Sequence, residues 1–198
     1  MLTVNQLTLT HRKDLTVLVD SLSFTLNDGE RLALIGEEGN GKSTLLHLIR
    51  NTLEKRSDLR IFYMPQDAGD LLDFSLSPVE LLSPSGEKED RSRAGILLGS
   101  MKFTADEMNH PIAGLSGGQK AKLMFLMMAE SGANVLLLDE PTRNLSPLSG
   151  PVIRELLAEY PGCIITVSHD RRLIQEVCTR TVTLTPEGVR PSSFCDNF

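Results

Sequence analysis

Residues 36–44 combine glycines, a lysine and two hydroxyl groups in a spacing suited to holding phosphates. They read Gly36, Glu37, Glu38, Gly39, Asn40, Gly41, Lys42, Ser43 and Thr44, which fits the pattern G-x-x-x-x-G-K-[ST]. Glycines allow positive φ angles and close backbone approach, so a run of N–H groups can face a chain of phosphates. Lys42 would supply a cation for the β- and γ-phosphates, and the Ser43 hydroxyl would be a ligand for Mg²⁺. The pattern therefore predicts a binding loop for MgATP.

The residues on either side of this loop supply the context that the pattern needs. Residues 31–35 form a short apolar run that ends at the first glycine, and residues 45–49 continue as an apolar helical stretch. A strand, a loop and a helix in this order place the phosphates at a helix N-terminus, where the helix dipole adds a favourable potential. The flanks therefore favour a phosphate loop over a glycine-rich turn in an ordinary α/β protein.

Two carboxylates follow a second apolar run. Residues 134–138 are almost uninterrupted in apolar character and predict a strand buried on both faces of a parallel sheet. Asp139 and Glu140 come next, at the strand end where open α/β sheets place their ligand sites. Asp139 would hold the metal, directly or through water, and Glu140 could orient and deprotonate the attacking water. The alternative, a helix-capping pair after a core strand, is disfavoured by the phosphate loop.

A histidine and a glutamine follow two further predicted strands. Residues 163–167 lead to His169, and residues 61–64 lead to Gln66. His169 could donate a hydrogen bond to an oxygen of the γ-phosphate. The amide oxygen of Gln66 could reach the metal or its water. A lone histidine or glutamine is more often structural, so both roles depend on the other motifs.

Far downstream of the phosphate loop, residues 115–119 read Leu-Ser-Gly-Gly-Gln, and with this signature the chain resembles an ATP-binding cassette (ABC) nucleotide-binding domain over nearly its whole length. The resemblance implies an α/β fold, a P-loop NTPase with a RecA-like, mostly parallel sheet core, an antiparallel β-layer and a small helical subdomain. In this family Ser116, Gly117 and Gly118 begin a helix and bind the γ-phosphate held by the opposite subunit. The resemblance therefore implies that ATP is hydrolysed between two cassettes arranged head to tail.

The expected site residues fall into three groups. The catalytic group is Glu140, His169, Gln66 and Lys42, and the metal ligands are Ser43, Gln66 and Asp139. The nucleotide-binding group comprises residues 36–44 together with Ser116, Gly117, Gly118, Gln119 and His11. An adenine-stacking aromatic residue, which the family places near residues 9–13, is missing, and His11 and Arg12 are the planar side chains that could replace it.

The chain is predicted to be one cassette over residues 1–198. Its ATPase core would comprise about 1–66 and 131–198, with a helical subdomain that carries the signature at about 67–130. Alternating residues at 4–10 and 17–26 predict an antiparallel β-layer. A methionine-rich helix is expected over 118–130, with its methionines in the core, and residues 191–198 are expected to be loose.

Finer similarity points to the F subfamily, soluble cassettes associated with translation and ribosome protection. Residues 98–107, 119–123 and 167–172 carry this similarity. Two departures stand against it. Chains of this subfamily usually carry two cassettes joined by a charged linker, whereas this sequence has one phosphate loop, one signature and no such linker. Ser146 stands where the loop after Glu140 usually ends in Asp, which bears on that loop's contact across the dimer.

Composition limits the partners. A net charge of −6 gives no general basic footprint for nucleic acid, although Arg12-Lys13 or Arg171-Arg172 could form a local patch. Three scattered cysteines and the absence of a long apolar stretch indicate a cytoplasmic chain, peripheral to a membrane only through a partner. The expected partner is a second cassette, the same chain or a different one. The ribosome and a separate transmembrane permease are two alternative further partners. A third alternative function, a nonhydrolytic ATP-gated clamp, is disfavoured by the presence of Glu140 and His169.

Overall fold

The computed structural model describes residues 2–10, 17–145, 147, 149–185 and 188–192 of the 198. Its strands are β1 (Leu2–Thr10), β2 (Val17–Leu26), β3 (Arg31–Ile35), β4 (Ile61–Met64), β5 (Val135–Asp139), β6 (Cys163–Val167), β7 (Arg180–Thr185) and β8 (Gly188–Ser192). Its α-helices are α1 (Lys42–Leu53), α2 (Pro78–Leu82), α3 (Lys88–Ser100), α4 (Ala105–Asn109), α5 (Gly117–Glu130), α6 (Gly150–Glu159) and α7 (Arg171–Val177).

A six-stranded sheet with the order β4-β5-β6-β3-β7-β8 forms the centre of the molecule. The first five strands are parallel, and β8 pairs antiparallel with β7. β1 and β2 form a separate antiparallel pair. All residues of β5 and β6 are buried, which explains why these strands read as continuous apolar runs without alternation. The predicted α/β class, with a mostly parallel sheet and a separate antiparallel layer, is confirmed.

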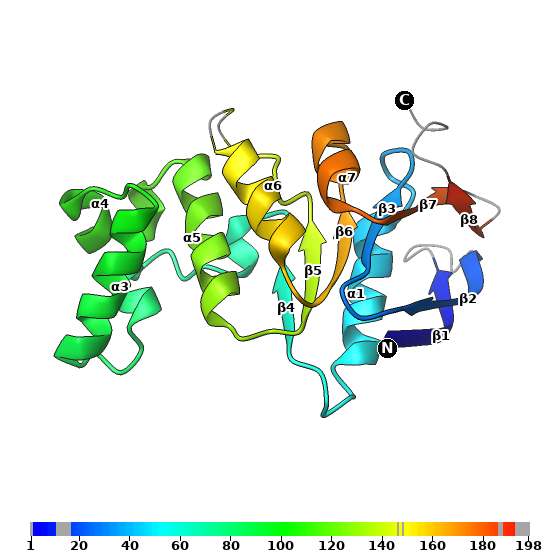
Figure 1. Cartoon of the computed structure of the whole chain (residues 1–198), viewed down its shortest axis with the longest axis horizontal. Helices are drawn as coiled ribbons and strands as arrows, with labels where there is room; N and C mark the ends of the chain where they lie inside the picture. The colour runs from blue at the N-terminus through cyan, green and yellow to red at the C-terminus, as the bar shows by residue number, and fades with distance from the viewer. Residues whose placement is uncertain (1, 11–16, 146, 148, 186–187, 193–198) are drawn as a thin grey trace.

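Residues 68–130 contain helices and no strand, and α3 and α4 lie at the end of the molecule opposite β1 and β2 (Figure 1). Three helices in this part start in the same way. A serine or threonine, Ser77, Thr104 or Ser116, accepts a hydrogen bond from the residue three positions later, whose Glu or Gln side chain bonds back to the cap. These capping boxes satisfy N–H groups that a helix start leaves unpaired.

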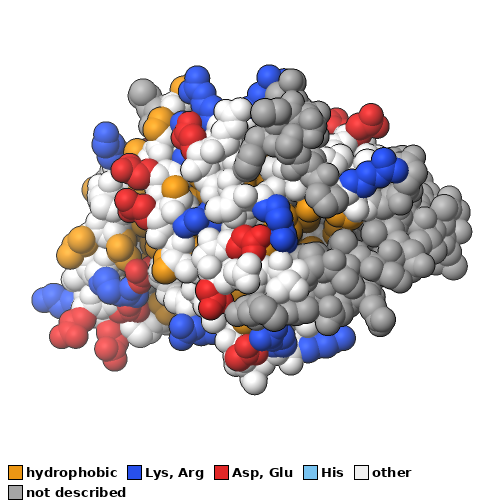
Figure 2. Space-filling view, turned by 45° about the vertical axis from the view of Figure 1, so that its right-hand side comes forward, with side chains coloured by type: hydrophobic (Ala, Val, Ile, Leu, Met, Phe, Trp, Pro, Cys, Tyr) orange, Lys and Arg blue, Asp and Glu red, His pale blue; other side chains and the backbone are white. Residues whose placement is uncertain are grey.

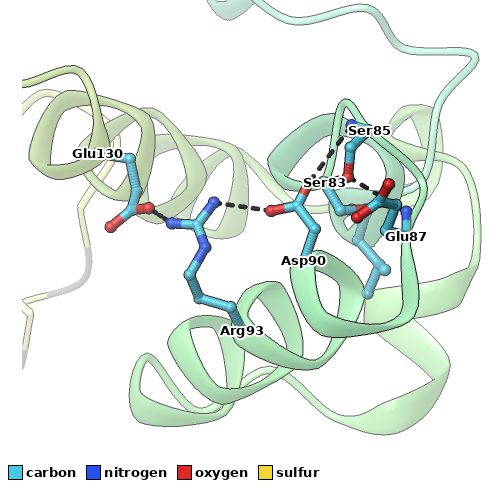
Figure 3. A network of polar contacts seen from close by, with 7 residues as sticks. Ser83, Ser85, Glu87, Asp90, Arg93 and Glu130 are labelled. Carbon is cyan, nitrogen blue, oxygen red and sulfur yellow. Dashed lines mark hydrogen bonds and ion pairs between the residues drawn. The ribbon is translucent and has the colours of Figure 1, made fainter.

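A polar network joins α3 to the C-terminal end of α5 (Figure 3). Arg93 pairs with Asp90 at 3.0 Å on its own helix and with Glu130 on α5. Asp90 also accepts a hydrogen bond from the Ser85 hydroxyl at 2.9 Å. Most of the charged segment 87–93 is exposed. Pairs on such a surface each contribute little to stability, so the network mainly orients the two helices.

The apolar core lies on both faces of the sheet. Leu137 of β5 packs in a cluster with α1, whereas its neighbour Leu138 packs in a second cluster with α5 and α6, because successive strand residues point to opposite faces. Met124 and Met128 of α5 are buried in the second cluster, which confirms the core role predicted for the methionines.

Two predicted boundaries were wrong. α5 begins at Gly117, one residue before the predicted start, because Ser116 is its N-cap. Residues 191 and 192, expected to be loose, belong to β8, where Pro191 pairs with Val182. β8 is an edge strand, and a proline is tolerated there because its missing N–H is not needed on the open side. β8 follows β7 directly in the chain and pairs with it as a hairpin, although the proline in this segment did not indicate a strand.

Candidate active site

The phosphate loop leaves β3 through a glycine that the fold requires. Gly36 has φ 143°, and a Cβ atom on it would lie 2.5 Å from the carbonyl oxygen of Leu184 in β7. Asn40 donates a side-chain hydrogen bond to the same carbonyl at 3.4 Å. Gly41, with φ 83°, is the N-cap of α1. The loop is therefore packed against β7 at its start and delivers the N-terminus of α1 at its end.

Lys42, the first residue of α1, turns its side chain back into the loop. Its Nζ donates to the carbonyl oxygens of Gly36 at 2.8 Å and Glu37 at 2.6 Å. The side chain is buried, and this burial lowers the pKa of Lys42, whereas the carboxylates of Glu140, Glu38 and Asp139 oppose the shift. The ammonium is thus held at the centre of the loop, where it would meet an anionic phosphate chain.

Asp139, at the end of β5, is a buried carboxylate with spare hydrogen-bonding capacity. It is 3% exposed, and within the described part of the chain its Oδ1 atom has no hydrogen-bond partner. Burial raises its pKa, while a hydrogen bond with Ser43 and the nearby His47 and Lys42 act in the opposite direction. A carboxylate oxygen with a free lone pair beside a serine hydroxyl matches the oxygen ligands that Mg²⁺ prefers, so these residues fit the metal.

Glu140 and His169 meet at the ends of the neighbouring strands β5 and β6. The Glu140 backbone, with φ 48°, donates to the Val167 carbonyl at 2.9 Å and so continues the strand pairing. The His169 N–H donates to Glu140 Oε2 at 3.4 Å, and His169 Nε2 lies 3.6 Å from Oε1. Burial raises the pKa of Glu140, although the His169 N–H bond and the His169 ring oppose it.

A cavity of about 700 Å³ brings the three expected metal ligands together. Ser43, Gln66 and Asp139 line it, along with Gly117 and Lys120 from α5. A second cavity of about 570 Å³ includes Gly36, Glu37, Asn40 and His169 in its lining. The phosphate loop is therefore accessible from two cavities, one with the expected metal ligands and the other with the histidine.

The signature residues lie at the start of α5. Ser116 accepts a hydrogen bond from the Gln119 N–H at 3.3 Å, and Gln119 Oε1 accepts one from the Ser116 N–H at 2.7 Å. Gly117 and Gly118 lie against Asn144 in the loop after Glu140, where a Cβ atom on Gly118 would come within 3.3 Å of the Asn144 carbonyl. The signature thus contacts the loop that follows the carboxylate pair of its own chain.

Comparison with known proteins decides the family. The family model described as ABC transporter matches residues 19–143. The chain belongs to the ABC transporter family. The resemblance in its motifs is thereby confirmed.

Relatives of this ABC chain include members of the F family. ABC transporter F family member 4 of Arabidopsis thaliana is 39% identical over 81% of the chain and 24% of its own length. YdiF of Bacillus subtilis is 35% identical over 96% of the chain and 30% of its own length. The chain thus spans a third or less of the length of these curated relatives.

Solved ABC cassettes have the same fold. A dimeric post-hydrolysis state of the ATP-binding cassette MJ0796, bound to ADP and Pi, superposes with a TM-score of 0.77 at 20% identity, covering 98% of this chain and 99% of that one. A second dimeric structure of MJ0796, described as a bacterial ABC transporter cassette, superposes with a TM-score of 0.76 at 21% identity, covering 96% of each chain. In the described part of this ABC chain, no helix has the length and apolar character needed to cross a membrane.

Some residues near the site were not anticipated, and some expected ones lie outside it. His47 and Tyr63 line the larger cavity, with the Tyr63 hydroxyl 3.1 Å from His47 Nε2. His47 stands four residues after Ser43 on α1, a spacing that places both on one helix face and could have indicated it. Asn144 carried no signal in the sequence. His11 and Ser146 lie outside the described residues.

Proposed function

We propose that this ABC chain binds MgATP and hydrolyses it by in-line attack of water on the γ-phosphate. The observation that carries the proposal is the meeting of three strand ends. β3, β5 and β6 are neighbours in the sheet, and their carboxyl ends lead to Lys42, to the Asp139–Glu140 pair and to His169. ABC cassettes are ATPases, and this edge of a parallel sheet is where such folds bind ligands.

The residues that hold the nucleotide follow from their contacts. Lys42 would exchange its two carbonyl partners for phosphate oxygens, and the backbone N–H groups of residues 36–44 would face the phosphate chain. Ser43, Asp139 and Gln66 would hold Mg²⁺, since all three line one cavity. When bound, the metal would neutralise charge on the β- and γ-phosphate oxygens.

Glu140 is proposed as the base that accepts a proton from the attacking water. Burial raises the pKa of Glu140 toward neutral pH, and this makes its carboxylate a stronger base than that of an exposed glutamate. The His169 backbone N–H donates to this carboxylate, and the half-exposed imidazole, 3.6 Å from its other oxygen, would donate to a γ-phosphate oxygen.

We propose that Ser116, Gly117 and Gly118 act on the nucleotide of a second cassette arranged head to tail. Their N–H groups stand at the start of α5, where the helix dipole favours an anion. The dimeric MJ0796 structures support a partner of the same kind, and the second cassette would be another copy of this chain or a related one. Residues 67–130 would act as a helical subdomain that carries the signature, beside an ATPase core formed by 1–66 and 131–198.

The biological role proposed is that of an F-type factor that acts on the ribosome. The F family relatives support this role over that of an ATPase subunit for a separate permease. Figure 2 shows basic and acidic side chains interspersed over the coloured surface of the face that it presents, and the net charge is −6. Binding to ribosomal RNA would therefore depend on a few specific contacts rather than on a general basic surface.

Two measurements test this proposal separately. Release of inorganic phosphate from MgATP by the purified chain tests the ATPase, and its absence even at high protein concentration, where a dimer would form, would contradict hydrolysis. Sedimentation of the chain with ribosomes in the presence of a slowly hydrolysed ATP analogue tests the role. Recovery with membranes through one defined protein, instead of with ribosomes, would favour the permease subunit.

A further inference from the structure

The outer face of α6 carries apolar side chains that the chain itself does not cover. Three large apolar side chains are exposed within the described residues, namely Ile96 at 74%, Val152 at 56% and Leu156 at 37%. Val152 and Leu156 stand four residues apart on α6 and therefore lie one above the other on one face of the helix. The buried face of α6 is made by other residues, Ile153 and Leu157. The exposed pair thus forms a second apolar stripe on the same helix.

This stripe borders a preformed hollow. A cavity of about 520 Å³ is lined by Val152, Leu156 and Tyr160 together with Met128 and Ala129 of α5. The Tyr160 hydroxyl donates to the Ala133 carbonyl at 2.6 Å, and Arg31 donates to the carbonyl oxygen of Tyr160 at 3.0 Å. Because these bonds fix the wall at the end of α6, a partner would meet the surface with little cost in ordering it.

The charges around this hollow are separated by sign. Glu155 and Glu159, both exposed, line the same cavity as the apolar pair. A neighbouring cavity of about 260 Å³ shares Val152 and is lined by Lys102 and Lys122. Along α6, Glu155 lies between Val152 and Leu156 and Glu159 lies beyond Leu156, so the carboxylates line the Leu156 side of the apolar pair, whereas the two lysines lie on the Val152 side.

Lys102 occupies a backbone position that glycine would fill at lower cost. Its φ is 62°, and it ends α3 in a turn in which its N–H donates to the Gly99 carbonyl at 2.9 Å and the Phe103 N–H to the Leu98 carbonyl at 3.1 Å. A residue with a side chain pays on the order of 1 kcal/mol for this conformation. A lysine here thus adds a positive charge to this surface at a cost to the turn.

We propose that this strip, which we call the α6 groove (Lys102, Lys122, Val152, Glu155, Leu156 and Glu159), docks one amphipathic helix of a partner protein. The partner helix would present apolar residues at a spacing of three and four to Val152 and Leu156, with Lys or Arg at the end that meets Glu155 and Glu159. Asp or Glu at its other end would meet the two lysines. The groove is walled by helices, whose backbone groups are already paired, so side-chain packing and not strand addition must hold the partner.

The experiment uses a labelled helical peptide of about 14 residues, or four turns. It carries leucines on one face, Lys and Arg at one end and Glu at the other. A second peptide has its basic end replaced by Glu. Fluorescence anisotropy with the 198-residue chain, without nucleotide, measures both affinities. We expect the first peptide to bind roughly tenfold or more tightly than the second, since its basic end faces Glu155 and Glu159.

Protein variants locate the binding. Val152→Ser with Leu156→Ser should weaken the first peptide at least about tenfold, as loss of central apolar contacts does at interfaces. Ile96→Ser, which removes the other exposed apolar side chain outside the groove, should leave its affinity unchanged. Glu155→Lys with Glu159→Lys should reverse the preference, so that the second peptide binds more tightly. Thermal unfolding of each variant checks that these exposed substitutions keep the fold.

Three results would overturn the proposal: no binding of the first peptide, equal binding of both peptides to the original chain, or an equal loss of affinity in Ile96→Ser. Because the assay contains no nucleotide, its outcome is independent of the proposed ATPase.

Discussion

The imidazole Nε2 of His169 lies 3.6 Å from Oε1 of Glu140, while the backbone N–H of the same histidine donates to Oε2 at 3.4 Å. His169, just after β6, thus lies against both carboxylate oxygens of Glu140, just after β5. The backbone contact persists whatever side chain stands at position 169, and the ring contact does not. The position of the carboxylate is therefore set partly by the sheet itself and partly by the imidazole.

These two contacts predict that substitution of Glu140 and substitution of His169 reduce the rate of phosphate release by different amounts. Glu140→Gln should reduce phosphate release by about 10²–10⁴-fold, the usual contribution of a general base, with MgATP binding retained. His169→Ala should cost less than Glu140→Gln, because the backbone N–H at position 169 still holds the carboxylate. Single-turnover phosphate release under saturating ATP compares the two. An equal or larger loss for His169→Ala would contradict this order and would mean that the proposed contact of the imidazole with the γ-phosphate contributes as much as the base.

With hydrolysis slowed, two cassettes should remain together around ATP. Light scattering should find Glu140→Gln as a dimer with ATP and the original chain mainly as a monomer during turnover. Adding Ser116→Arg should abolish this dimer, because a bulky cation would occupy the N-terminus of α5. Since Ser116 also caps α5, Ser116→Ala is the control for loss of the cap alone and should keep more of the dimer than Ser116→Arg. A monomeric Glu140→Gln at saturating ATP would point to a different cassette as partner.

Lys42→Ala should abolish measurable ATP binding in calorimetry while circular dichroism remains that of a folded chain. The ammonium contacts the loop's own carbonyls, and its burial lowers its pKa, so the nucleotide-free fold does not gain from its charge. Glu54→Ala, which removes a surface ion pair with Arg50 at the far end of α1, is the matched control and should bind ATP normally. Binding by Lys42→Ala within a few-fold of the original would reject the role given to this lysine.

Asp139→Asn should stabilise the nucleotide-free protein at neutral pH. Burial raises the pKa of Asp139 above its ordinary value of 3.8. A carboxyl group with a raised pKa in the folded state destabilises the fold above that raised pKa and has no such effect below the pKa of the unfolded chain. The gain should appear in urea unfolding as a higher midpoint, because the amide carries no charge for burial to destabilise. It should fade as the pH falls through the raised pKa toward the ordinary value, and a gain that persists there would contradict this cause.

Gly36→Ala should destabilise the chain and weaken ATP binding together. The new methyl group would lie 2.5 Å from the Leu184 carbonyl at a φ of 143°, so either the loop or β7 must move. Gly95→Ala in α3 is the matched control. Its Cβ would meet nothing within 4 Å, and alanine in a helix should raise the free energy of unfolding by about 0.5–1 kcal/mol. A urea unfolding curve of Gly36→Ala that coincides with that of the original chain would show that the contact with β7 is not needed.

The sequence by itself determined the local elements of the site. The phosphate loop is contiguous, so its pattern, with an apolar strand before it and a helix after it, predicted β3 and α1. The runs before Asp139 and His169 predicted β5 and β6, because strands buried on both faces need apolar residues throughout. The capping box at Ser116 is likewise local, although the predicted start of α5 was one residue late.

Only the tertiary structure decided which of these elements meet. The order β5-β6-β3 places Glu140 beside His169 and close enough to Lys42 for its charge to act on the pKa of the lysine, and local periodicity does not encode this strand order. The contact of Gly118 with Asn144 is also long-range. The exposed stripe on α6 is of the same kind, since the packing of α6 through its other face leaves the apolar residues Val152 and Leu156 exposed.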